Sequence, residues 1–249
     1  MTAIARILSI AGSDSGGGAG IQADIKTITM LGGHAMTAIT AVTAQNSAGV
    51  TAIDVMTPEM VQAQIWAVID DFGIDAVKIG MLGSSANALS VAEFLRSVKG
   101  KPVIFDPVMV ATSGADLADE HTIAAFRQII PLSSLVTPNL GEMERLGGEA
   151  MMTGFNVPFL VKGGHGKEDI LIDRLLGPEG EIARWEGQRI DTRHNHGTGC
   201  TLSAAIATHL GRGLSMLDAI AKARDYVRAS LNAAPGLGAG CGPMGIPRP

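Results

Sequence analysis

The sequence predicts an α/β protein built on a mostly parallel sheet that helices cover on both faces. Short, continuously apolar segments alternate with longer segments in which apolar residues recur at helical spacing. Strands that are apolar throughout are typical of a parallel sheet buried on both sides. Of the 249 residues, 46% are hydrophobic and 17% are charged, which suffices for one sizeable core. We therefore expect a single domain over residues 1–249.

Composition and charge exclude several classes of protein. The formal net charge of −5 argues against a nucleic-acid-binding protein, which would normally carry a basic patch. No apolar run has the length of a membrane-spanning helix, and no signal peptide precedes the first strand. Cys200 and Cys241 make neither a disulfide framework nor a metal cluster. We expect a cytoplasmic protein that acts on a small molecule, with no nucleic-acid or membrane partner.

The chain begins with a predicted strand, a glycine-rich segment over residues 11–20 and a helix. No Gly-Lys-Ser/Thr ends that segment, so it is not a P-loop, and the acidic partner of a dinucleotide-binding fingerprint is missing. Two interpretations remain, a backbone loop that closes over a small ligand and a flexible turn. The elements expected in this part are strands over residues 4–10, 35–43 and 50–56, and helices over residues 21–31 and 57–72.

Alternating strands and helices continue through the middle of the chain. The strands are expected over residues 76–79, 103–105, 135–137 and 159–161, and the helices over residues 85–98, 119–130 and 140–146. Each strand is followed by glycine or polar residues, with Met81 beside Gly80 after the first: Gly80, Asp106, Asn139, Glu142, Lys162, Gly163 and Gly164. Singly, such residues could be helix caps or solvated charges. Because ligands of open parallel sheets bind beyond the carboxyl ends of the strands, we expect a site at this edge.

The last third is expected to hold an antiparallel pair over residues 169–176 and 181–188, then two helices over residues 197–210 and 216–231. The motif His196-Gly197-Thr198-Gly199-Cys200 opens the first of these helices. Unpaired amides and the positive end of the dipole make a helix N-terminus suitable for an anion, and they favour a thiolate. Glycines that serve only packing and a simply buried cysteine are the alternative.

Taken together, these motifs resemble the hydroxymethylpyrimidine/phosphomethylpyrimidine kinases of thiamine biosynthesis, a branch of the ribokinase-like superfamily. The resemblance rests on residues 11–24, 43–47, 78–82, 106–109, 137–139, 161–165 and 196–201. It implies a three-layer α/β/α sandwich of ribokinase-like type. It also implies phosphorylation of 4-amino-5-hydroxymethyl-2-methylpyrimidine and of its monophosphate, the use of ATP and Mg²⁺, and a homodimer.

The resemblance also implies a role for individual residues. The pyrimidine would be held by Gly12, Asp24 and Gln45 between apolar walls formed by Met81 and Val108. The phosphates and hydrated Mg²⁺ would lie near Asp106, Asn139 and Glu142. Glu142 would contact the metal, and Asp106 would contact it through water. The nucleotide would lie near Lys162 and Gly164. The transferring phosphoryl group would meet the amides of Gly197, Thr198 and Gly199.

Cys200 stands where sugar kinases of this superfamily carry an aspartate base, so the resemblance implies that it accepts the proton of the substrate hydroxyl. For that role we expect the helix end to depress the pKa of the thiol. The chain departs from the family in two places. Residues 143–157 form a shortened connection, and Asn195 replaces the threonine that usually precedes the glycine-rich motif.

Other functions remain open at this point. Relatives with a Gly-Thr-Gly-Cys motif also phosphorylate pyridoxal, although Gln45 and Met81 favour the pyrimidine. A sugar kinase is disfavoured by Cys200 at the base position. A non-catalytic sensor that binds the pyrimidine is the alternative of a different class. The segment 110–116 is expected to close over the site as a lid.

Overall fold

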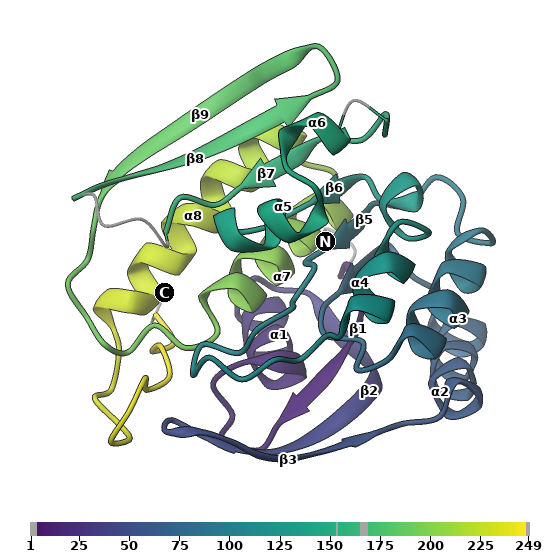
Figure 1. The fold of residues 1–249 in the computed structure, drawn as a ribbon, viewed down its shortest axis with the longest axis horizontal. Coiled ribbons are helices and arrows are strands. Elements are labelled where there is room, and N and C mark those ends of the chain that lie inside the picture. The colour runs from purple at the N-terminus through teal and green to yellow at the C-terminus, as the bar shows by residue number, and fades with distance from the viewer. Residues whose placement is uncertain (1–3, 153, 165–168, 248–249) are drawn as a thin grey trace.

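The computed structural model describes residues 4–152, 154–164 and 169–247, and its strands form one nine-stranded sheet (Figure 1). The order is β3-β2-β1-β4-β5-β6-β7-β8-β9. The strands are β1 (Arg6–Asp14), β2 (His34–Asn46), β3 (Gly49–Val55), β4 (Ala76–Ile79), β5 (Val103–Phe105), β6 (Leu135–Val136), β7 (Phe159–Val161), β8 (Ile170–Gly177) and β9 (Gly180–Gln188).

The helices connect these strands in the expected alternation. They are α1 (Gly20–Met30), α2 (Pro58–Phe72), α3 (Ser85–Leu95), α4 (Glu120–Phe126), the 3₁₀ turn η1 (Ile130–Leu132), α5 (Leu140–Leu146), α6 (Glu149–Met152), α7 (Thr198–Gly211) and α8 (Met216–Asn232). Strands β2, β1, β4, β5, β6 and β7 pair in parallel, whereas β3 at one edge and β8 and β9 at the other are antiparallel. The parallel strands direct their carboxyl ends to one edge.

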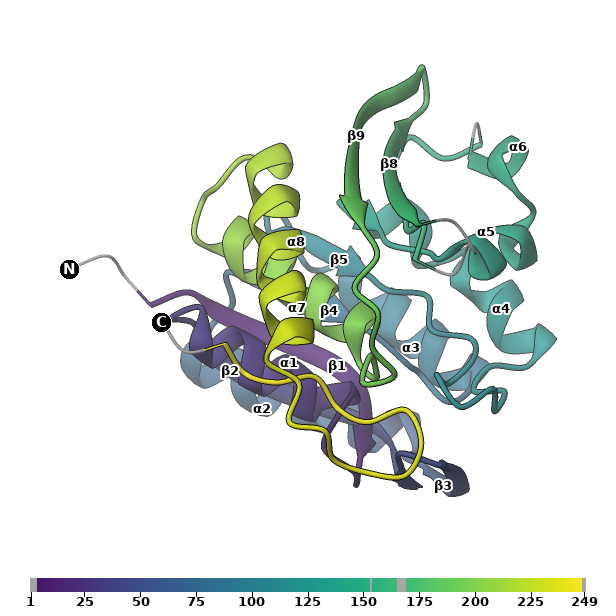
Figure 2. The same ribbon diagram turned by 90° about the vertical axis from the view of Figure 1, so that its left-hand side faces the viewer.

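Two hydrophobic clusters lie on the two faces of this sheet. Successive side chains of a strand point to opposite faces, so Leu8 and Val77 enter one cluster while Ile7 and Ala76 enter the other. The first cluster includes residues of α2, α3, α4 and α5, and the second includes residues of α1, α7 and α8. Figure 2 shows the sheet with helices on both sides. The predicted three-layer α/β/α class with a mostly parallel sheet is confirmed.

Local sequence signals explain the starts of several helices. The hydroxyl of Thr57 accepts a hydrogen bond from the amide of Met60 at 3.3 Å, Pro58 occupies the first turn of α2, and Gly73 ends the helix with φ of 70°. The hydroxyl of Ser215 likewise accepts the amide of Asp218 at 3.2 Å at the start of α8. Among the described helices, none combines the length and hydrophobicity needed to cross a bilayer.

The structure differs from the expected elements at several ends. Strand β1 continues to Asp14, because Ser13 and Asp14 pair with Val42 and Thr43 of β2, and so part of the glycine-rich segment is strand. Helices α3 and α4 end a few residues early, at Leu95 and Phe126. The shortened connection 143–157 contains the additional turn α6. Backbone pairing and short turns of this kind leave little periodicity in the side chains.

Candidate active site

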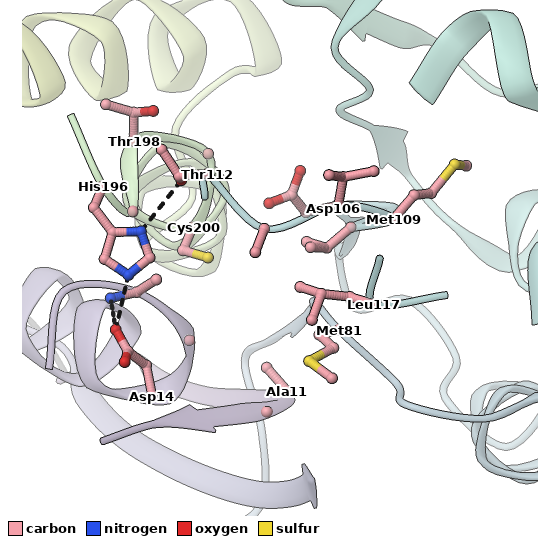
Figure 3. A pocket seen from close by; sticks show the side chains of 18 of the residues that line it. Ala11, Asp14, Met81, Asp106, Met109, Thr112, Leu117, His196, Thr198 and Cys200 are labelled. Atoms are coloured by element: carbon pink, nitrogen blue, oxygen red, sulfur yellow. Dashed lines mark hydrogen bonds and ion pairs between the residues drawn. The ribbon is translucent and has the colours of Figure 1, made fainter. Parts of the chain in front are cut away.

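A cavity of about 520 Å³ opens beyond the carboxyl ends of the parallel strands. Its walls come from the carboxyl ends of β1, β2 and β4, from the segments after β1, β4, β5 and β6, from Lys162 after β7, and from the start of α7. It brings together these predicted site residues: Gly12, Gln45, Met81, Asp106, Val108, Asn139, Glu142, Lys162, Gly197, Thr198, Gly199 and Cys200. Figure 3 shows Met81, Met109 and Leu117 across the cavity from Cys200 and His196. Of the predicted set, Asp24 and Gly164 do not line this cavity.

A buried ion pair between Asp106 and Lys162 lies at the centre of the site. Oδ1 of Asp106 accepts a hydrogen bond from Nζ of Lys162 at 2.9 Å and another from the hydroxyl of Thr137 at 3.1 Å. Burial opposes ionisation of Asp106, but Lys162 and Lys78 outweigh it and lower the pKa of that carboxyl. The site therefore holds a carboxylate and an ammonium group side by side. The ammonium group suits a phosphate, and the carboxylate suits the cation that accompanies a phosphate.

Glu142 completes the acidic side of the site and also caps α5. Its Oε2 accepts the amide of Asn139 at 2.8 Å, while the side chain of Asn139 accepts the amide of Glu142 at 2.9 Å. The same Oε2 lies 4.0 Å from Nζ of Lys162. Burial raises the pKa of Glu142, and Lys162 opposes that rise. The capping box fixes the direction in which this carboxyl faces the cavity.

The start of α7 presents its amides to the same place. Gly197 caps the helix with φ of 86°, in the left-handed region that favours glycine. The amide of Thr198 donates to the carbonyl of Asn195 at 3.3 Å, so this predicted anion donor is already engaged. Within the described residues, no hydrogen bond is formed by the amides of Gly199 and Cys200 to a protein acceptor. Gly199 and Cys200 therefore offer the more accessible donors for an anion.

Replacing Gly197 by alanine should damage both stability and activity. The left-handed φ costs an alanine about 1–2 kcal/mol, and its Cβ would also overlap the carbonyl of Gly18. We expect Gly197→Ala to lower the free energy of unfolding, measured in urea, by about 2 kcal/mol or more. Gly49→Ala is the matched control, because no atom lies within 4 Å of a Cβ there. Equal stability of the two variants would contradict this role of Gly197.

The pKa of the Cys200 thiol differs from the expectation. Burial raises its pKa to about 11, while Lys78 and the amide of Gly20 favour the thiolate without offsetting burial. Asp24 and Asp106 add to the rise, since a thiolate near two carboxylates is disfavoured. The expectation of a depressed pKa at this helix end is therefore wrong for the protein without bound ligands. The reason is that one helix terminus cannot outweigh desolvation and two nearby acids.

Asp24 does not reach the cavity. Its side chain is completely buried and forms an ion pair with Nζ of Lys78 at 2.9 Å, and it accepts the hydroxyl of Ser9 at 2.5 Å. Lys78, which is also completely buried, does line the cavity. In this structure Asp24 binds Lys78, and Lys78 in turn lines the cavity. The family resemblance implied that Asp24 holds the pyrimidine, but α1 turns this side chain toward Lys78 of β4.

Gly164 lines a second cavity of about 410 Å³ next to the first. Residues shared by both cavities are Thr112, Lys162, Asn195, Thr198 and Gly199. The second cavity is also lined by Arg189, Arg224 and Arg228. The two spaces therefore meet at Lys162 and the start of α7, which is the arrangement needed when one bound molecule passes a group to another.

Several residues that line the first cavity had no individual role predicted from the sequence, among them Asp14, Lys78, Thr112 and His196. Nε2 of His196 lies 3.0 Å from Oδ2 of Asp14, and Nδ1 lies 3.2 Å from the hydroxyl of Thr112 (Figure 3). His196 opens the motif that ends in Cys200, which was a signal of its position. Its partners are distant in sequence, so local pattern could not reveal them.

The match to known proteins agrees with this geometry. The family model of phosphomethylpyrimidine kinase matches residues 14–245. The chain belongs to this family. A hydroxymethylpyrimidine/phosphomethylpyrimidine kinase of Rhizobium meliloti is 45% identical, over 98% of this chain and 97% of that protein. The motif-based expectation of a phosphotransferase of this family is confirmed.

Solved structures show the same fold. An ADP complex of Bacillus subtilis pyridoxal kinase is 31% identical, with a TM-score of 0.86, and covers 98% of this chain and 97% of that one. A phosphomethylpyrimidine kinase of Clostridium difficile is 34% identical, with a TM-score of 0.77, and covers 90% of this chain and 98% of that one. The ribokinase-like assignment is confirmed by these neighbours.

Proposed function

We propose that this family member phosphorylates the hydroxymethyl group of 4-amino-5-hydroxymethyl-2-methylpyrimidine and then its monophosphate, using ATP, in thiamine biosynthesis. One observation carries the proposal: a cavity lined by Gln45, Met81 and Val108 also contains Cys200 and the accessible amides at the start of α7. The amide of Gln45 suits the ring nitrogens and exocyclic amine of an aminopyrimidine. Met81 and Val108 supply apolar walls for a flat ring.

The residues of the chain divide the work of the transfer. Cys200 accepts the hydroxyl proton while the substrate oxygen bonds to the γ-phosphorus, and the bond from that phosphorus to the oxygen of the leaving ADP breaks. The amides of Gly199 and Cys200 donate to the transferring phosphoryl oxygens and oppose the charge that builds there. Lys162 lies where the two cavities meet and neutralises phosphate charge at that junction. Asp106 holds Lys162 in place through the 2.9 Å ion pair.

The donor set fits a hydrated Mg²⁺. The described residues contain no group of three or more His, Cys, Asp or Glu side chains arranged to hold a metal. Magnesium that comes with a nucleotide needs only one or two carboxylates, because phosphate oxygens and water supply the other ligands. Glu142 and, through water, Asp106 would hold it, and the ion would supply charge neutralisation at the phosphates. ATP would occupy the second cavity, near Gly164 and Lys162.

A pyridoxal kinase is the second candidate, because the B. subtilis pyridoxal kinase superposes over nearly all of this chain. ATP turnover with the products identified by mass separates the candidates, using the pyrimidine alcohol, its monophosphate and pyridoxal side by side. Successive mono- and diphosphate from the pyrimidine is the expected result. Product from pyridoxal alone would replace the proposal by the second candidate. Tight pyrimidine binding without turnover of any of the three would identify a sensor.

We also propose a homodimer. The antiparallel edge strand β3 exposes Ile53 and Val55, and Val42 on the neighbouring strand β2 is exposed as well. An apolar edge of this kind favours association with a second copy. Light scattering behind size exclusion should give twice the mass of one chain, and a monomer mass at assay concentration would contradict the proposal.

A further inference from the structure

The loop at residues 110–116 lines the first cavity, reaches the second cavity through Thr112, and is held together by internal hydrogen bonds. The amide of Ala111 donates to the carbonyl of Ala115 at 2.8 Å, and the amide of Gly114 donates to the carbonyl of Ala111 at 2.8 Å. Thr112 lines both cavities. The loop is thus a compact unit, and its position over the cavities depends on the contacts that it makes outside itself.

Thr112 connects this loop to His196. The hydroxyl of Thr112 lies 3.2 Å from Nδ1 of His196, whose Nε2 lies 3.0 Å from Oδ2 of Asp14 (Figure 3). A carboxylate only accepts hydrogen bonds, so Nε2 carries the proton that faces Asp14. In the tautomer that carries its single proton on Nε2, Nδ1 can accept from the hydroxyl of Thr112. This tautomer allows both hydrogen bonds of the series, from Thr112 to His196 and from His196 to Asp14.

The carboxylate of Asp14, at the end of this series of hydrogen bonds, is firmly held. The carboxylate of Asp14 accepts the amides of Gly16, Gly18 and Ala19 at 2.8, 2.9 and 2.8 Å. A Cβ at Gly18 would lie 2.5 Å from Cδ2 of His196, so the absence of a side chain there makes room for the imidazole. His196 is therefore fixed by the glycine-rich loop, and it offers Thr112 a rigid partner.

Among the described residues, the loop also forms an outward ion pair between Asp116 and Arg145 at 3.5 Å. The side chain of Asp116 is 79% exposed, and exposed ion pairs of this length contribute little. His196 also lies beside Gln45 on the substrate side of the cavity, with the side-chain nitrogen of Gln45 3.3 Å from its Nε2. With the proton of His196 on Nε2 both nitrogens are donors, so this is a packing contact and not a hydrogen bond. Thr112 itself is exposed, but its hydroxyl meets the buried imidazole of His196, so this half-buried contact links the loop to the interior of the site.

We propose that His196 is a positioning residue that fastens the 110–116 loop, through Thr112, over the junction of the two cavities and against Gln45. Its catalytic consequence rests on the proposed function. A fastened loop keeps water from the phosphoryl group during transfer and holds the alcohol beside it. A loosened loop admits water, so ATP would be hydrolysed without phosphorylation of the alcohol.

Thr112→Val tests this, because valine keeps the size of threonine and lacks the hydroxyl. We expect KM for the pyrimidine alcohol to rise about three- to tenfold, with a smaller change in kcat, as loss of one hydrogen bond would give. We also expect more than one ADP released for each phosphorylated product. In the free protein, the amides of Ala111 and Gly114 should exchange faster with deuterium. Thr112→Ser should restore all of these, and Ser113→Ala, whose side chain lines neither cavity, is the matched control.

The outcomes separate this proposal from the proposed function. If Thr112→Val matches Ser113→Ala in amide exchange, KM and the ratio of ADP to product, the positioning role of His196 is overturned. If the unsubstituted protein turns over none of the substrates, the proposed function fails instead. The exchange of the loop amides still decides in that case, because it is measured without substrate.

Discussion

Cys200→Ala should lower kcat for the pyrimidine alcohol by about 10²–10⁴-fold, with KM changed about twofold or less. The thiol is the group that we expect to take the hydroxyl proton, while the amides that hold the phosphoryl group belong to the backbone and remain. Alanine at the third position of α7 is compatible with the helix, so folding should be preserved. Steady-state kinetics with both substrates measures the two constants.

Cys241→Ala is the control for loss of a thiol from the same cavity: Cys241 also lines it but lies outside the start of α7, so this variant should keep most of the activity. The pH dependence provides a second check. Burial raises the pKa of Cys200 to about 11, so the thiolate is scarce at neutral pH and its population grows as pH rises. The kcat of the unsubstituted protein should therefore climb between pH 6 and pH 9, on the order of tenfold per unit at most, and Cys200→Ala should lack this climb. Equal pH profiles for the two would exclude Cys200 as the base.

The position of the site could be predicted from the sequence because it follows from the fold class. Once the strands are recognised as parallel, their carboxyl ends must share an edge, and Asp106, Asn139 and Lys162 follow three of them. The 2.9 Å pair of Asp106 and Lys162 lies at that edge. The direction of a single side chain within a motif is not set in this way.

Asp24 illustrates that limit. Its motif suggests a ligand contact, but a helix presents its side chains in all directions, and this one faces the sheet. A sequence signal for this was present. Asp24 shares a helical face with Ile21 and Ile28, and Lys78 stands inside the apolar segment 76–79. Opposite charges within two apolar faces are typical of a buried ion pair.

The contact of Asp14 with His196 had no such signal. The two residues are 182 positions apart, and each belongs to a glycine-rich segment that has no periodicity. The pKa of Cys200 was mispredicted for a related reason. It depends on Lys78, Asp24 and Asp106, which the fold gathers from three different elements around the thiol.

Lys78→Met should have the largest effect on stability, because it leaves the carboxylate of Asp24 buried without its counter-ion. Both side chains are completely buried, and removing one partner of such a pair typically costs about 3–5 kcal/mol. Urea unfolding at pH 7 measures this loss. Burial already raises the pKa of Asp24, and without Lys78 it would rise further. As pH increases, the unfolded state then releases this proton before the folded state does, so the loss of stability grows with pH and is smaller at pH 5 than at pH 8.

The double variant Lys78→Met/Asp24→Asn decides whether Asp24 acts through Lys78 or on the substrate. If the pair is structural, the neutral amide relieves the buried charge, and the double variant should be more stable than Lys78→Met alone, with little dependence on pH. Asp24→Asn alone should then lower stability because Lys78 loses its partner. If Asp24 instead held the pyrimidine, Asp24→Asn would raise KM at unchanged stability, and the two losses would simply add. The ion pair at 2.9 Å, with both groups removed from solvent, predicts strong coupling between the two substitutions.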